Sequence, residues 1–125
     1  MKYSLVITQT AEGETSVTAV DAEGEIIGGA LVLNYSYDGA AYRLEIAQNA
    51  MAQTRDGEVK LYMFFAEGQT TAARLSDGVN VGEFSVRTKK LAVQFDGADC
   101  KAECEFSYGD GGDIISLSVV ASILQ

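Results

Sequence analysis

Two neighbouring carboxylates are the first residues whose spacing could do chemistry. Glu103 and Glu105 stand two positions apart in an alternating segment, so on a strand both lie on one face, about 7 Å apart. That separation is close to the span between the acid and base of glycosidases. Lys101 shares the same face, and the alternation places that face in solvent. We therefore interpret these side chains as a solvated charged stripe, and a carboxylate-based enzyme ranks last among the functions considered.

The two cysteines are the next candidates. On one strand Cys100 and Cys104 would lie about 13 Å apart at about 3.3 Å per residue. A disulfide needs Cα atoms within about 7 Å, so these two cannot pair with each other. No other soft metal ligand occurs in the chain. We expect buried, reduced, inert thiols, no metal site and no cofactor.

Glycine-rich segments could cradle an ion or a phosphate. The segment Gly109-Asp110-Gly111-Gly112-Asp113 lacks the spaced acidic ligands and terminal Glu of a calcium loop, so we expect a hairpin turn there. No phosphate-binding glycine motif opens a helix anywhere in the chain.

Composition excludes several activities. The 125 residues contain no His, no Pro and no Trp, and 9 Lys+Arg against 18 Asp+Glu give a net charge of −9. Without His there is no Ser-His-Asp or Cys-His catalysis and no His metal ligand. The acidic balance argues against nucleic acid and against anionic membranes. The local basic cluster of Arg87, Lys89 and Lys90 is expected to be a solvated strand end.

The chain has the size and composition of one globular domain. We expect a single domain over residues 1–125, because the sequence is 47% hydrophobic and 22% charged and shows no linker or repeat. The N-terminus has no apolar signal region, and no apolar run approaches the roughly 18 residues of a membrane span. We therefore expect a cytoplasmic protein.

Aromatic side chains suggest a ligand pocket. By alternation, seven of them should project to one interior, and together they could line an apolar pocket with phenol groups for orientation: Tyr35, Tyr37, Tyr42, Phe65, Phe84, Phe106 and Tyr108. Arg55, just before a turn, could reach a ligand carboxylate at the pocket mouth. The alternatives are that the aromatics form only a packed core and that Arg55 is a surface turn residue.

Two apolar residues break the polar face of one expected strand. Tyr62 and Phe64 stand at positions that alternation places in solvent, which indicates an exposed patch. The sequence thus supports two non-enzymatic functions. The first is binding of a small apolar or amphipathic ligand in the interior. The second is a protein-interaction or assembly module, with this patch as a homodimer contact.

Strands must position all these residues. Apolar residues recur at every second position between turn signals, as in strands with one buried and one wet face. About ten strands are expected from eleven runs, with one or two merged: residues 3–10, 15–22, 26–37, 41–47, 49–55, 58–66, 69–75, 79–88, 90–96, 99–108 and 113–123. Residues 47–54 contain helix formers; we favour a strand there over a short helix.

Turn signals separate the runs. Four Asp-Gly pairs, at Asp38, Asp56, Asp77 and Asp96, predict hairpins with type I′ turns, which need positive φ at both central residues. Glu12-Gly13, Glu23-Gly24 and Glu67-Gly68 indicate further turns, and Gly28-Gly29 indicates a bulge or a sharp bend. The missing proline suits a sheet in which every N–H is paired.

These features predict an all-β fold. About ten meandering strands in so short a chain must each hide one face, and closure removes exposed edges. We expect an antiparallel up-and-down barrel of about 8–10 strands, with a two-sheet β-sandwich as the alternative.

The middle of the chain resembles a known family. Five segments carry the resemblance: Leu33-Asn34-Tyr35-Ser36-Tyr37, Arg55-Asp56-Gly57, Met63-Phe64-Phe65-Ala66-Glu67-Gly68, Val81-Gly82-Glu83-Phe84-Ser85-Val86-Arg87-Thr88 and Glu105-Phe106-Ser107-Tyr108. Over roughly residues 25–123 the chain is similar to the small bacterial YwiB-like family, although that family usually has an aromatic where Ala73-Arg74 stand. The resemblance implies a calycin-like, lipocalin-type barrel in the cytosol of Gram-positive bacteria, and no reaction.

Overall fold

The computed structural model describes residues 1–109 and 111–124, and every regular element in them is a β-strand. The prediction of an all-β chain is confirmed. No helix that is long and apolar enough for a membrane span occurs in these residues. The ten strands are β1 (Lys2–Ala11), β2 (Glu14–Ile27), β3 (Ala30–Tyr37), β4 (Ala40–Ile46), β5 (Met51–Asp56), β6 (Lys60–Phe65), β7 (Thr70–Ser76), β8 (Val81–Asp96), β9 (Asp99–Tyr108) and β10 (Ile115–Ile123).

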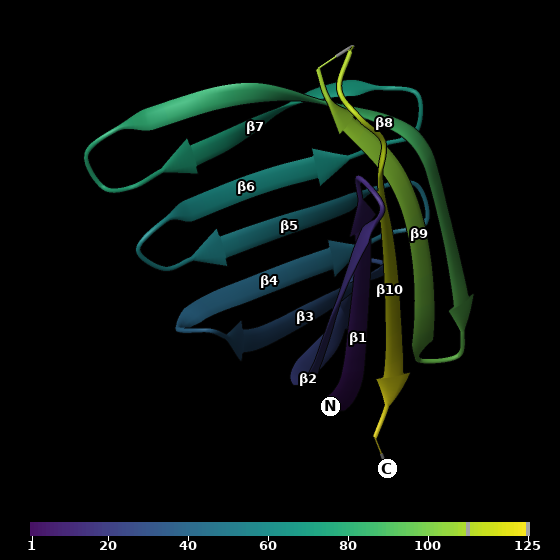
Figure 1. Ribbon diagram of the computed structural model, residues 1–125. Helices are drawn as coiled ribbons and strands as arrows, with labels where there is room; N and C mark the ends of the chain where they lie inside the picture. The colour runs from purple at the N-terminus through teal and green to yellow at the C-terminus, as the bar shows by residue number, and fades with distance from the viewer. Residues whose placement is uncertain (110, 125) are drawn as a thin grey trace.

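The strands form a closed antiparallel barrel (Figure 1). Each strand pairs with the next one in the chain, and β10 pairs with β1 from Ile115 opposite Ala11 to Ile123 opposite Tyr3. This last pairing joins the two ends of the meander. The predicted up-and-down barrel is confirmed, and the alternative of two separate sheets does not occur.

Two long strands turn the corners of the barrel. The first part of β8 pairs with β7 and its second part only with β9, with a register shift between Thr88 and Lys90. In the same way β2 pairs with β3 only from Glu23 to Ile27. In Figure 1, β3 to β7 therefore run across the direction of β1, β9 and β10. This arrangement is typical of orthogonal packing, in which strands switch sheets through bends or bulges.

Alternating side chains fill the interior between these two layers. The largest fully buried side chains come from strands of both layers: Tyr3, Leu5, Leu31, Leu33, Ile46, Met51, Phe65, Val86 and Val119. Cys100 and Cys104 are buried on the same face of β9 and are free thiols. The barrel interior is thus a packed core over much of its length.

The turns differ in part from the prediction. Of the four Asp-Gly pairs, only Asp38-Gly39 has positive φ at both residues, 50° and 77°. Gly28-Gly29, with φ of 59° and 83°, is the two-residue turn between β2 and β3, so it is a sharp bend and not a bulge. The run predicted as one strand over 26–37 is therefore the end of β2 and the whole of β3.

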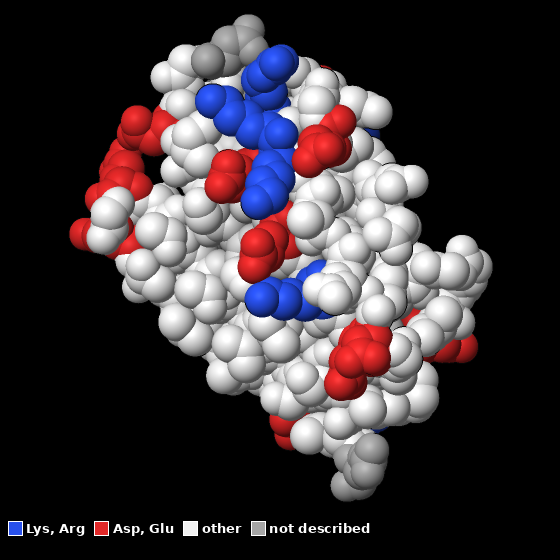
Figure 2. Space-filling model, turned by 90° about the vertical axis from the view of Figure 1, so that its right-hand side faces the viewer, with Lys and Arg blue, Asp and Glu red and all other residues white. Residues whose placement is uncertain are grey.

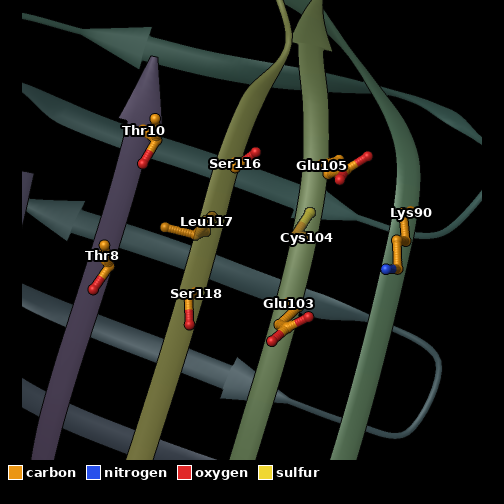
Figure 3. Close-up of a pocket in the computed structure, with 9 residues that line it drawn as sticks. All are labelled: Thr8, Thr10, Lys90, Glu103, Cys104, Glu105, Ser116, Leu117 and Ser118. Atoms are coloured by element: carbon orange, nitrogen blue, oxygen red, sulfur yellow. The ribbon is translucent and has the colours of Figure 1, made fainter. Parts of the chain in front are cut away.

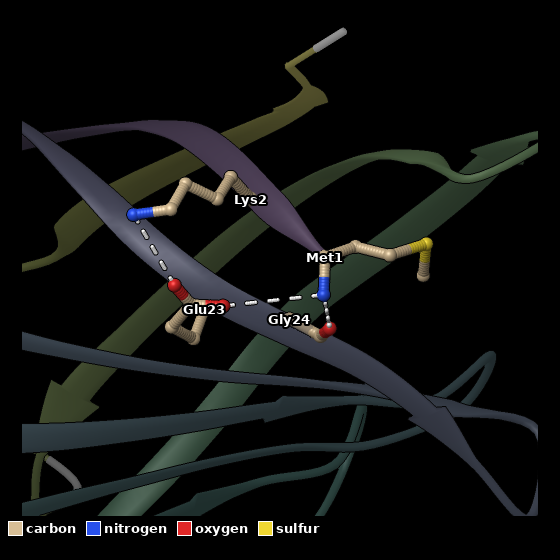
Figure 4. A network of polar contacts seen from close by, with 4 residues as sticks. All are labelled: Met1, Lys2, Glu23 and Gly24. Atoms are coloured by element: carbon tan, nitrogen blue, oxygen red, sulfur yellow. Dashed lines mark hydrogen bonds and ion pairs between the residues drawn. The ribbon is translucent and has the colours of Figure 1, made fainter.

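The turn predicted at Glu23-Gly24 is wrong. Both residues lie within β2, opposite Asn34 and Leu33 of β3. The backbone of Gly24 also pairs with the first residue of the chain: its N–H donates to the Met1 carbonyl (2.8 Å), and its carbonyl accepts from the Met1 amino group (3.1 Å). Figure 4 shows this contact beside the Lys2–Glu23 ion pair of 3.4 Å. Glycine occurs here because the Tyr3 ring occupies the place of a side chain.

Three further segments show how the predicted runs join. The favoured strand over 47–54 is confirmed from Met51 onward, and residues 47–50 form a connection without a helix. The predicted runs 79–88 and 90–96 merge into β8. The glycine-rich segment after Tyr108 connects β9 to β10, although its Asp110 lies outside the described residues.

A buried hydroxyl at the bend of β8 leads to a stability prediction. Thr88 is fully buried, and its Oγ1 has no hydrogen-bond partner in the described part of the chain. Thr88→Val removes this unpaired group at nearly constant volume, so we expect unfolding free energy to rise by about 1 kcal/mol. Thr71→Val is the matched control, because Thr71 Oγ1 donates to the Phe64 carbonyl at 2.5 Å, and it should cost about 1 kcal/mol. Urea unfolding measures both; a loss of stability in Thr88→Val would contradict the assignment.

Candidate binding site at the barrel end

Six of the seven predicted aromatic residues form two clusters. Tyr35 and Tyr42 stack face to face, with ring centroids 5.0 Å apart and planes 3° from parallel. The second cluster runs through Phe65–Phe106, Phe106–Tyr108 and Phe84–Tyr108, at 4.8, 5.7 and 5.3 Å. Tyr37 belongs to neither stack. Phe65, Phe106 and Tyr35 are buried core residues, while Tyr42 and Phe84 are half-buried against the core.

Arg55 lies beside the first cluster. Its Nε donates to the Tyr42 hydroxyl at 3.1 Å, and its Nη1 donates to the Val59 carbonyl at 2.6 Å. The guanidinium carbon is 5.9 Å from the centre of the Tyr42 ring. In the register, Arg55 faces Tyr42 on one side and Leu61 on the other, which are interior positions. Arg55 is thus held by two hydrogen bonds at the end of the barrel, just before the β5–β6 turn.

One end of the barrel is open and apolar. Three hairpins turn there, between β3 and β4, β5 and β6, and β7 and β8, on the left of Figure 1. Tyr37 and Leu75 lie at this end and have the same inward parity as the core residues of their strands. The ring of Tyr108 contacts Phe84 there. These three side chains nevertheless remain 46%, 42% and 47% exposed. Apolar groups that face inward are therefore left uncovered.

Gly82 leaves space within this end. It lies opposite Leu75 in the register, two residues before Phe84 on the same face. A Cβ built on Gly82 would meet no atom within 4 Å. A strand glycine in an interior position normally makes room for a neighbour, as Gly24 does for Tyr3. Gly82 is itself exposed, so the space beside it is unfilled by the described residues and open to solvent.

Two polar groups accompany the apolar wall. Gln53 faces the interior between Leu44 and Met63, and it is only half-buried. Neither its amide nor the Tyr35 hydroxyl has a hydrogen-bond partner among residues 1–109 and 111–124. Burial, together with the nearby Tyr42, raises the pKa of Tyr35 to about 12, so this hydroxyl stays protonated and can donate at neutral pH. Sequence reasoning missed Gln53, although its parity with Met51 and Arg55 points to the interior.

The outer surface of the same strands carries a hollow. It measures about 460 Å³, and seven of its lining residues alternate outward: Thr54, Asp56, Lys60, Tyr62, Arg74, Ser76 and Val81. The other three, Arg55, Leu61 and Leu75, have inward parity. Tyr62 is exposed there, as predicted, but Phe64 is half-buried. The expected exposed pair thus reduces to Tyr62.

The predicted carboxylate pair lies on the opposite layer. Figure 3 shows Glu103 and Glu105 on β9, beside Lys90 of β8, at a shallow hollow of about 150 Å³ on the outer face. Lys101 Nζ is 3.5 Å from a Glu103 oxygen, and both side chains are about half exposed. The expected charged stripe is present there.

The basic cluster belongs to this same face. Arg87, Lys89 and Lys90 are exposed on β8, and Lys90 stands opposite Glu105 of β9. In Figure 2, Lys and Arg gather along one line of the surface with Asp and Glu between them. The two signs of charge therefore alternate across β8 and β9.

The comparisons with known proteins concern the fold. No family model matches the chain, and no curated protein matches its sequence. The crystal structure of the ywiB protein from Bacillus subtilis superposes with a TM-score of 0.78, over 99% of this chain and 91% of that one. The chain has a YwiB-like fold. At 14% sequence identity the likeness extends to the barrel, and function has to be argued from the site.

Proposed function

We propose that this chain is a non-enzymatic binding protein that holds one small amphipathic molecule at the open end of the barrel. The observation that carries this proposal is the set of inward-facing apolar side chains left 42–47% exposed at that end. Ligand sites are typically apolar hollows with a few convergent polar groups. The empty space over Gly82 would take the apolar part of the ligand, against Leu75 and Phe84.

The polar part of the ligand would face Arg55 and Gln53. Arg55 uses Nε and Nη1 in hydrogen bonds to other described residues, which leaves Nη2 free to donate. A guanidinium presents its remaining N–H groups to carboxylate, sulfonate or phosphate oxygens. Tyr42 and Val59 hold the group in place, so little conformational entropy is lost on binding. An anionic or strongly accepting head group with an apolar body fits this arrangement.

Filling the space over Gly82 tests the proposal. An anilinonaphthalene sulfonate dye, which is an amphipathic anion, is expected to bind with a rise in fluorescence. Gly82→Leu should weaken this binding by about ten-fold, or about 1.4 kcal/mol, because the new side chain occupies the site. The matched control is Ser85→Leu, which adds the same side chain on the exposed outer face of β8 and should leave dye affinity unchanged.

Two outcomes would count against the proposal. Dye binding that is equally strong in wild type and Gly82→Leu would place the dye elsewhere. No binding of the dye or of aliphatic carboxylates would leave the barrel end without a ligand of this class. The alternative function, assembly through Tyr62, is distinguished by light scattering: a dimer that Tyr62→Ser dissociates supports assembly, and a strict monomer opposes it.

A further inference from the structure

Half of β2 has an open edge. From Glu14 to Glu23 the strand pairs with β1, while its pairing with β3 begins only at Glu23. No strand of the described residues pairs with the other side of Glu14–Ala22. The open edge of β2, meaning residues 14–22, thus presents backbone groups on one side of a regular, extended strand.

The contacts of Gly24 identify which groups point outward. Its N–H and C=O both bond to Met1, on the β1 side, as Figure 4 shows for the carbonyl. In an antiparallel ladder both groups of a residue point the same way, and the direction alternates along the strand. The β1–β2 register is continuous, so the backbones of Thr15, Val17, Ala19 and Asp21 face the open edge. Val17 is 61% exposed.

The barrel has a second edge of this kind, and it is closed by side chains. From Lys90 to Asp96, β8 pairs only with β9. There a Glu67 oxygen accepts from the Leu91 N–H at 3.1 Å, and Gln48 Nε2 donates to the Val93 carbonyl at 2.9 Å. Such covering, like Lys, Pro or a bulge on the strand, blocks pairing with another chain. Residues 14–22 contain no Lys and no Pro, show no register shift, and receive no side-chain cap from described residues.

Charge selects the partner for the open edge. Residues 15–20 are uncharged, whereas Glu12 and Glu14 stand at one end and Asp21 and Glu23 at the other. A second copy of this strand, laid antiparallel, would bring the acidic end at Glu12 and Glu14 of one copy near the acidic end at Asp21 of the other, and like charges oppose that approach. Glu23 already pairs with Lys2, so a cationic segment would meet Glu12 and Glu14 at one end and Asp21 at the other, in either direction.

We infer that the open edge of β2 binds an extended segment of a partner protein, with an uncharged β-branched centre flanked by Lys or Arg. The segment adds a strand beside β2 and forms main-chain hydrogen bonds with Val17 and Ala19. Its basic flanks lie near the carboxylates at the two ends. This mode of recognition takes affinity from the backbone and specificity from alternate side chains. It uses a different surface from the barrel end.

The test uses a synthetic peptide of alternating Thr and Val with two lysines at each end, labelled for fluorescence anisotropy. We expect binding that weakens with added salt and that slows amide exchange at Thr15, Val17 and Ala19. Ala19→Pro removes one outward N–H without touching the β1 ladder, so affinity should fall by about ten-fold or more. Ala19→Ser keeps the N–H and is the matched control.

A second variant keeps the test independent of the proline. Asp21→Lys should weaken the lysine-flanked peptide and strengthen the same peptide with Glu flanks. Equal binding of both peptides by wild type, or protection at Gly82 and Tyr37 in place of β2, would overturn the inference. So would a concentration-dependent dimer that Ala19→Pro abolishes, because the occupant would then be a second copy of this chain.

Discussion

Gly24→Ala is expected to lower the free energy of unfolding by about 3 kcal/mol, which is the upper range for an overpacked core. A Cβ at this position would overlap the ring of Tyr3. That ring cannot move aside, because Tyr3 is fully buried and its hydroxyl donates to the Ala98 carbonyl at 2.9 Å. The clash must therefore shift either the backbone of β2 or the packing of the core.

Gly82→Ala is the matched control for this prediction. It is also a strand glycine, but its added Cβ meets no atom within 4 Å. It should leave stability unchanged or raise it by about 0.5 kcal/mol, since alanine restricts the unfolded chain. Urea unfolding of both variants makes the comparison. Equal stability of Gly24→Ala and wild type would show that Tyr3 does not hold β2 in place.

Alkaline pH is expected to destabilise the fold through its two buried thiols. Burial raises the pKa of Cys100 from 9.0 to about 11. Burial, with a smaller contribution from Glu105, raises the pKa of Cys104 from 9.0 to about 12. Above pH 9 the unfolded chain releases protons that the folded chain retains, so stability is constant below that pH and falls as pH rises toward 12. At about pH 10.5 each thiol should cost about 2 kcal/mol.

Replacing the thiols isolates their contribution. The double variant Cys100→Val, Cys104→Val keeps both positions apolar and removes both titrations. Denaturant unfolding at about pH 8 and pH 10.5 should show a loss of about 4 kcal/mol in wild type beyond the loss in the variant. Tyr35, with its pKa raised to about 12 by burial, still titrates in both. Parallel pH profiles for the two proteins would refute the assignment.

Local patterns predicted the strands well, because alternation reflects which face of a strand is buried and needs no knowledge of its partners. The inward positions of Phe65, Phe106 and Tyr35 followed from parity alone. So did the buried, unpaired thiols of Cys100 and Cys104. The hairpin at Asp38-Gly39 followed from the need for positive φ.

Features that depend on contacts between distant segments could not be predicted in this way. Glu23-Gly24 has the composition of a turn, yet it lies within β2 because the ring of Tyr3, from another strand, fills the place of a side chain. Gly28-Gly29 forms the actual turn directly after the last β2–β3 pair, in which Ile27 lies opposite Ala30. Both sites are glycine-containing pairs that interrupt an apolar pattern, and only packing shows which of them is the turn.

The sequence by itself determined that the chain is a meander of amphipathic strands with an aromatic interior and an acidic outer surface, because period and composition are properties of each segment alone. The tertiary structure decided which interior positions are filled and which edges are paired. Tyr37, Leu75 and Gly82 share the inward parity of the core, yet they lie at an end that the other layer leaves open. The edges of β2 and β8 likewise depend on where each strand changes its partner. Both outcomes follow from how two crossing layers overlap, which no single segment encodes.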